Sequence, residues 1–86
     1  MKVTIRVKNK TFLEPKVKDY AEEKLAKIEQ YFRHSDDLVA NVLCKEYDDS
    51  KVVEVTIPTK NIFLIAEVRE ATYDNAIDRD VEKLES

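Results

Sequence analysis

Four stretches of the chain alternate between apolar and polar residues, a pattern typical of β-strands that bury one face. The predicted strands cover residues 2–8, 38–47, 51–57 and 62–69. Residues 47–50 and 58–61 are rich in Asp, Ser, Thr, Asn and Pro, which favour turns. The last three strands are therefore expected to pair in sequence, as a meander of hairpins.

The alternation also predicts which side chains of each strand face the core. The inward residues are expected to be Val3, Ile5, Val7, Leu38, Ala40, Val42, Cys44, Val53, Val55, Ile57, Ile62, Leu64, Ala66 and Val68. The opposite face of the first strand carries Lys and Arg, so we expect a basic outer surface there.

Two further stretches have the spacing of amphipathic helices, with apolar residues every three or four positions. The first covers residues 15–33, and its apolar residues are Val17, Tyr20, Ala21, Leu25, Ile28, Tyr31 and Phe32. Pro15 suits the first helical position, where a missing N–H costs no hydrogen bond, and we expect this helix to end near Arg33 or His34. Thr72 is a good N-cap for the second helix. The inward residues of that helix are Tyr73, Ala76, Ile77, Val81 and Leu84.

The order β-α-β-β-β-α predicts an α+β fold of two layers, in which both helices pack on one face of a four-stranded sheet. Each element has a single apolar face, and this arrangement buries all of them against one another. The first strand is expected beside either the second or the fourth strand. The 86 residues are expected to form a single domain, 1–86.

Residues that would support catalysis are scarce in this chain. The absence of glycine excludes the glycine-rich phosphate loops of nucleotide-binding proteins. The only histidine, His34, has no nucleophile placed near it by the sequence. We therefore predict no enzyme, no cofactor, no metal site and no small-molecule substrate.

The single cysteine, Cys44, cannot form an internal disulfide and is interpreted as a small buried apolar residue. No run of about 18 apolar residues is present, and the N-terminus does not resemble a signal peptide. A cytoplasmic protein without a membrane partner is the simplest prediction.

Charge is divided unevenly along the chain, although the net charge is only −3. Residues 1–34 hold nine Lys or Arg against five Asp or Glu, whereas the remainder is strongly acidic. Such asymmetry is a hint of a basic patch that contacts phosphates. The alternative is an ordinary solvated helix surface, balanced by pairs such as Glu23 and Lys27.

The segments KNKTFLEPKVKDYAEEKLAKIEQYFRH, LVANVLCKE, VEVTIPTKNIFLIAE and NAIDRDVEKLE cover most of the chain in one consistent order. They resemble the N-terminal ribosome-binding domain of the ribosome hibernation promoting factor and ribosome-associated inhibitor family, which is sigma modulation protein-like. The resemblance implies binding to the small ribosomal subunit near the decoding centre, where the messenger RNA and transfer RNA sites would be blocked. It also implies that basic side chains contact ribosomal RNA.

Four lysines match positions that are usually basic in that family: Lys8, Lys24, Lys27 and Lys83. From the charge pattern alone we add Arg6, Lys10, Lys16 and Lys18 as candidate RNA contacts. The family's last helix normally continues into a basic end, where this chain has Ser86. That difference predicts the N-terminal part of a longer factor, or a relative with weaker binding. Arg79 and Asp80 stand where the family commonly has an apolar or small pair.

The sequence leaves open a second function, with ribosome binding lost: a small protein-interaction module, such as a homodimer, that uses the uncovered face of the sheet. Its candidate residues are Leu43, Val52, Phe63 and Ile65.

Overall fold

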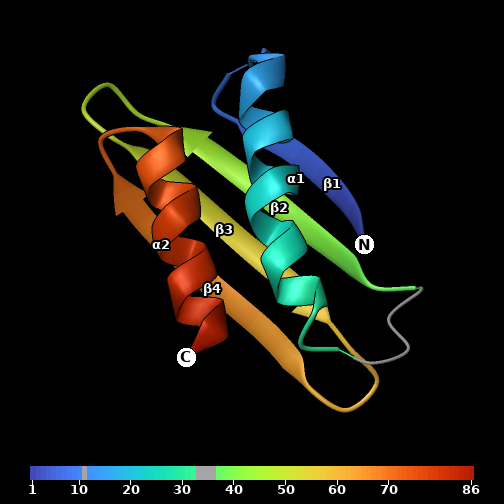
Figure 1. Ribbon diagram of the computed structural model, residues 1–86. Helices are drawn as coiled ribbons and strands as arrows, with labels where there is room; N and C mark the ends of the chain where they lie inside the picture. The colour runs from blue at the N-terminus through green and yellow to red at the C-terminus, as the bar shows by residue number, and fades with distance from the viewer. Residues whose placement is uncertain (11, 33–36) are drawn as a thin grey trace.

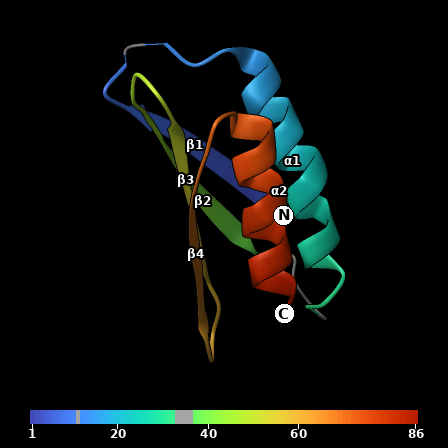
Figure 2. The ribbon, with the colours of Figure 1, turned by 90° about the vertical axis from the view of Figure 1, so that its left-hand side faces the viewer.

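The computed structural model describes residues 1–10, 12–32 and 37–86. Its elements, in chain order, are β1 (Lys2–Lys8), α1 (Pro15–Glu29), β2 (Val39–Glu46), β3 (Lys51–Pro58), β4 (Phe63–Glu70) and α2 (Tyr73–Glu85) (Figure 1). Seen along the edge of the sheet, both helices lie on the same side and leave the other side uncovered (Figure 2). The predicted two-layer α+β fold is confirmed.

The order of strands in the sheet is β1-β2-β3-β4. The sequence left open whether the first strand lies beside the second or the fourth. In the structure β1 lies beside β2, and the two strands run parallel. The other pairs are antiparallel, as expected for hairpins. A parallel pair needs a long crossover, and α1 supplies it while covering the sheet.

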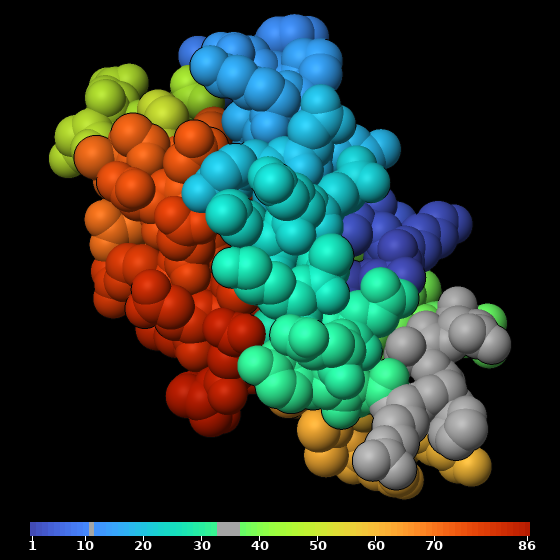
Figure 3. All heavy atoms as spheres, viewed as in Figure 1, coloured from blue at the N-terminus to red at the C-terminus, as the bar shows by residue number. Residues whose placement is uncertain are grey.

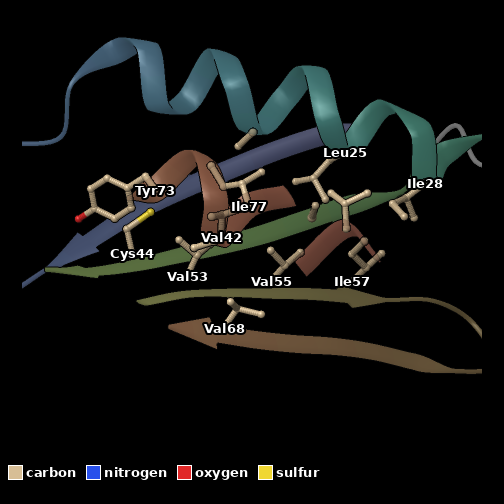
Figure 4. Close-up of a cluster of buried hydrophobic side chains, with 14 of the residues drawn as sticks. Leu25, Ile28, Val42, Cys44, Val53, Val55, Ile57, Val68, Tyr73 and Ile77 are labelled. Atoms are coloured by element: carbon tan, nitrogen blue, oxygen red, sulfur yellow. The ribbon is translucent and has the colours of Figure 1, made fainter. Parts of the chain in front are cut away.

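The core lies between the helices and the inner face of the sheet (Figure 4). The register sets Cys44 opposite Val53, and Val53 opposite Val68, so that one row of inward side chains crosses three strands. On the helical side of the core, α1 contributes Leu25 and Ile28, which are almost completely buried. Cys44 is buried as predicted, and burial raises the pKa of its thiol to about 12.

The predicted end of the first helix is wrong. Although Pro15 does begin α1, the helix stops at Glu29, and the N–H groups of Tyr31 and Phe32 bond carbonyls only three residues back. This tighter turn takes Tyr31 off the apolar face, and its side chain is 61% exposed. Arg33 and His34, where the end was expected, lie outside the described residues.

The predicted inward position of Ile62 is also wrong, since this residue precedes β4 and is 53% exposed. Its N–H donates to Thr59 Oγ1 at 3.0 Å, and its carbonyl accepts from the Thr59 N–H at 2.8 Å. Both main-chain groups of Ile62 are therefore used by the turn, and the strand starts one residue later.

The last helix begins as predicted, because Thr72 Oγ1 accepts from the Asn75 N–H at 3.2 Å. One polar residue of α2 is buried, however. Asp80 has no exposed surface, and neither of its carboxylate oxygens has a hydrogen-bond partner among the described residues. Burial raises the pKa of Asp80 to about 8, although the nearby charge of Lys83 opposes this.

In the described part of the chain, neither helix has the length and the apolar character that crossing a membrane would require.

Candidate nucleic-acid interface

The eight cations predicted to contact RNA do not form one continuous patch. Arg6 and Lys8 lie on the uncovered face of the sheet, and the other six lie on the helices or on the loop before α1. The predicted cations therefore lie in several separate places, each with its own surroundings.

On β1, Arg6 and Lys8 are exposed and point away from the helices, because the alternate residues of this strand pack against the core. In the register, Lys8 is paired with Lys45 of β2 and Arg6 with Leu43. Neither Arg6 nor Lys8 takes part in an ion pair with another described residue. Their charges are therefore available to a ligand.

Lys24 and Lys27 are in a different position, since they line the groove between α1 and α2. The groove has a volume of about 280 Å³, and its opposite wall carries Asp78, Glu82 and Glu85. The two helices lie side by side over the front of the molecule (Figure 3). Three carboxylates in the same groove reduce the attraction that these lysines exert on a phosphate.

The groove is also held together by a direct link between the helices. The Tyr20 hydroxyl of α1 donates to Asp78 Oδ1 at 2.7 Å, and this bond raises the pKa of Tyr20 to about 12. Lys24 Nζ lies 5.3 Å from the centre of the Tyr20 ring. The contacts around Lys24 thus stabilise the packing of the two helices, whatever further role Lys24 has.

Lys10 and Lys16 line a cavity of about 570 Å³ near the start of both helices. Each is already paired: Lys10 Nζ with Glu46 at 3.1 Å, and Lys16 Nζ with Glu14 at 3.3 Å. The hydrogen bond from Lys10 is the main reason why the pKa of Glu46 is lowered. This end of the molecule is therefore close to neutral.

The last two candidates stand apart from the others. Lys18 is exposed on α1. Lys83 donates from Nζ to the Glu67 carbonyl of β4 at 3.4 Å, so it leans toward the sheet edge and away from the groove. A direct RNA contact by Lys83, Lys24 or Lys27 remains a prediction.

The interaction face predicted from the sequence is smaller than expected. Phe63 and Ile65 are exposed, at 62% and 57%, and Leu43 is half-buried. Val52 is only 6% exposed, which corrects the prediction that it belongs to this surface. Its register neighbours are Lys45 and Arg69, and long aliphatic stems such as theirs shield an apolar side chain that lies between them.

Three basic residues on the uncovered face were not among the predicted contacts: Lys2, Lys45 and Arg69. The alternation in the sequence predicts that each of them faces outward, so the sequence did indicate that these cations lie on the uncovered face. What the sequence lacked was the register, which brings Lys45 beside Lys8. No group of three or more metal-ligating side chains occurs within residues 1–10, 12–32 and 37–86.

Comparison with protein families matches residues 3–86 to the family described as Sigma 54 modulation protein / S30EA ribosomal protein. The chain belongs to this family. The resemblance noted in the sequence is thereby confirmed, and the S30EA family is one of ribosome-associated factors, not enzymes, as predicted.

Two relatives are named ribosome hibernation promotion factor. The chain is 46% identical over 72 residues to the protein from Bacillus subtilis (strain 168) and 43% identical over 70 residues to that from Staphylococcus aureus (strain COL). These alignments cover 83% and 80% of the chain but only 38% and 37% of the relatives. The chain therefore spans well under half the length of these relatives.

The S30EA fold is also seen in solved structures. The crystal structure of the Thermus thermophilus Protein Y N-terminal domain matches with a TM-score of 0.82 and 25% identity, over 99% of this chain and 92% of that chain. A ribosomal subunit interface protein from Coxiella burnetii matches equally well in shape, with a TM-score of 0.82, over 99% of this chain and 90% of that chain. Its sequence identity is 16%, so this second match concerns the fold alone.

Proposed function

We propose that this chain is the ribosome-binding domain of a hibernation factor. In this proposal it binds the small ribosomal subunit near the decoding centre and keeps messenger RNA and transfer RNA from their sites on idle ribosomes. Its partner is ribosomal RNA, and the contacts are cationic side chains on phosphates, without reading of base sequence.

The observation that carries the proposal is the 46% identity, over 83% of the chain, to a protein named ribosome hibernation promotion factor. Two features of the surface support it. Arg6 and Lys8 are exposed on a rigid strand and are unpaired among the described residues. The strand holds the backbone of both residues in place before binding, so that only their side chains have to be ordered when they meet a phosphate.

Co-sedimentation of the chain with purified small ribosomal subunits, across a series of salt concentrations, tests the proposal. We expect pelleting at low salt and a loss of affinity of roughly tenfold or more between about 50 mM and 200 mM salt, because each phosphate contact releases counterions. Large subunits serve as the control and should bind far less of the chain. Absence of pelleting with small subunits even at the lowest salt would refute the proposal.

A further inference from the structure

The two layers of the molecule carry charge of opposite sign. In α1 four cationic side chains are balanced by four anionic ones, and α2 has two cations against five anions, of which only Asp80 is buried. The uncovered face of the sheet has the reverse excess, with two anions, Glu54 and Glu67. The five cations of that face, together called the basic sheet face, are Lys2, Arg6, Lys8, Lys45 and Arg69. A protein with a net charge of −3 thus has one distinctly positive side.

The cations of the basic sheet face are set in a regular arrangement by the strand register. Lys8, Lys45, Val52 and Arg69 are successive neighbours across β1, β2, β3 and β4. Neighbouring strands are about 4.8 Å apart, so this row is about 14 Å long. The row places three cations along one line across the sheet, so that a nucleic-acid backbone, which carries one negative charge at each phosphate, can meet several of them at once.

Arg69, at one end of the row, is held in place by its neighbours. Its guanidinium lies 4.9 Å from the centre of the Tyr47 ring and donates to Ser50 Oγ at 2.5 Å. Because the guanidinium is planar and stays charged, the part of it left uncovered is oriented for a phosphate before any ligand arrives.

The anions of this face are confined to the half of the sheet away from β1. Glu54 and Glu67 are register neighbours on β3 and β4, and Glu67 lies 3.5 Å from Lys45 Nζ. β1 itself carries three cations and no anion. The positive potential is therefore greatest along β1.

We propose that the basic sheet face is a docking surface for the phosphate backbone of RNA. Charge complementarity selects this ligand: β1 provides the contacts least opposed by carboxylates, and the row from Lys8 to Arg69 extends them across the sheet. On the same face, Phe63 offers an exposed ring on which an unpaired base can stack. The proposal rests on the proposed function for the source of the RNA. It assigns binding to the sheet because the groove between the helices, which Lys24 and Lys27 line, is also lined by three carboxylates, whereas β1 carries none.

Two double variants that change the net charge equally separate the two surfaces. The sheet variant is Arg6→Glu with Lys8→Glu, and the helix variant is Lys24→Glu with Lys27→Glu. Affinity is measured by fluorescence anisotropy for two probes, purified small ribosomal subunits and fluorescein-labelled poly-uridine. Circular dichroism checks that each variant folds. If the sheet variant does not fold, the neutral double variant Arg6→Gln with Lys8→Gln replaces it.

The sheet variant is expected to bind both probes at least about tenfold more weakly at low salt. For poly-uridine, the slope of log affinity against log salt should also become shallower by about 1.4, the amount expected for two lost phosphate contacts on a single strand. The helix variant should lose distinctly less with both probes. Equal or greater loss in the helix variant, or wild-type affinity in the sheet variant, would overturn the proposal.

The two probes distinguish failure of this proposal from failure of the proposed function. If wild-type protein binds subunits and the sheet variant binds them equally well, the function stands and the docking surface is wrong. If wild-type protein ignores subunits but binds poly-uridine through the basic sheet face, the docking surface stands and the function is wrong. A dimer in light scattering that the sheet variant dissociates, with RNA affinity unchanged, would show that a second copy covers this face and would overturn the proposal.

Discussion

Replacing Asp80 by asparagine is expected to increase the free energy of unfolding by about 2–4 kcal/mol at pH 8. The carboxyl of Asp80 is fully buried and lacks a hydrogen-bond partner among the described residues, and its pKa is raised to about 8. The ordinary pKa of an unfolded aspartate is about 3.9, and each unit of difference corresponds to about 1.4 kcal/mol. Asparagine has the same shape and cannot ionise, although its amide also loses contact with water, which reduces the gain.

The sign of the pH dependence follows from proton binding. Between about pH 4 and pH 8 the folded protein keeps a proton on Asp80 that the unfolded chain releases, so the contribution of this group to stability falls as the pH rises. The charged groups around it act in both directions. Lys83 and Arg79 of α2 lower the pKa, whereas Glu67 of β4 and Glu54 of β3 raise it.

Urea unfolding of the wild type and of Asp80→Asn at several values between pH 5 and pH 8 measures this effect. The two proteins should differ least at pH 5 and most at pH 8, with the asparagine variant the more stable at pH 8. Glu82→Gln, on the exposed surface of the same helix, is the matched control and should follow the wild type. Parallel stability profiles for wild type and Asp80→Asn would show that Asp80 does not keep its proton in the folded protein.

Leu25→Ala is expected to destabilise the protein by about 2–5 kcal/mol. Leu25 has no exposed surface and lies on the inner face of α1, between Ala21 and Ile28, in the core shared with the sheet (Figure 4). Removing three carbon atoms there loses contacts and leaves a cavity that the surrounding strands fill only in part. Urea unfolding at pH 6 gives the difference.

Glu22→Ala on the exposed side of the same helix is the control for Leu25→Ala, and it should change stability by no more than about 0.5 kcal/mol. A loss below about 1 kcal/mol for Leu25→Ala would mean that α1 is not packed on the sheet as described.

Much of the fold was predictable because alternation and helical spacing are local properties of the sequence. The residues predicted to face inward from β2 and β3 are all buried, and the N-cap of α2 was also predicted correctly. The end of α1 was missed because the apolar spacing continues through Tyr31 and Phe32, with no glycine or proline to mark the stop. The choice of β2 as the neighbour of β1 also depends on packing that no local pattern reveals.

The candidate site was predicted less completely, for two physical reasons. Whether Val52 is exposed depends on the register, which places the stems of Lys45 and Arg69 beside it. Whether Lys24 and Lys27 face water or carboxylates depends on how α1 and α2 lie together. The burial of Asp80, by contrast, could have been inferred, since Asp80 is spaced from Ala76 and Ile77 as inward residues of one helix are.

In the proposed function the chain occupies the messenger RNA and transfer RNA sites of the small ribosomal subunit, and a competition experiment tests this claim. Fluorescently labelled chain is titrated with empty small subunits and with subunits that already hold a short messenger RNA and a matching transfer RNA. We expect the filled subunits to bind the chain at least about tenfold more weakly, because the sites overlap. Equal affinity for empty and filled subunits would contradict the claim.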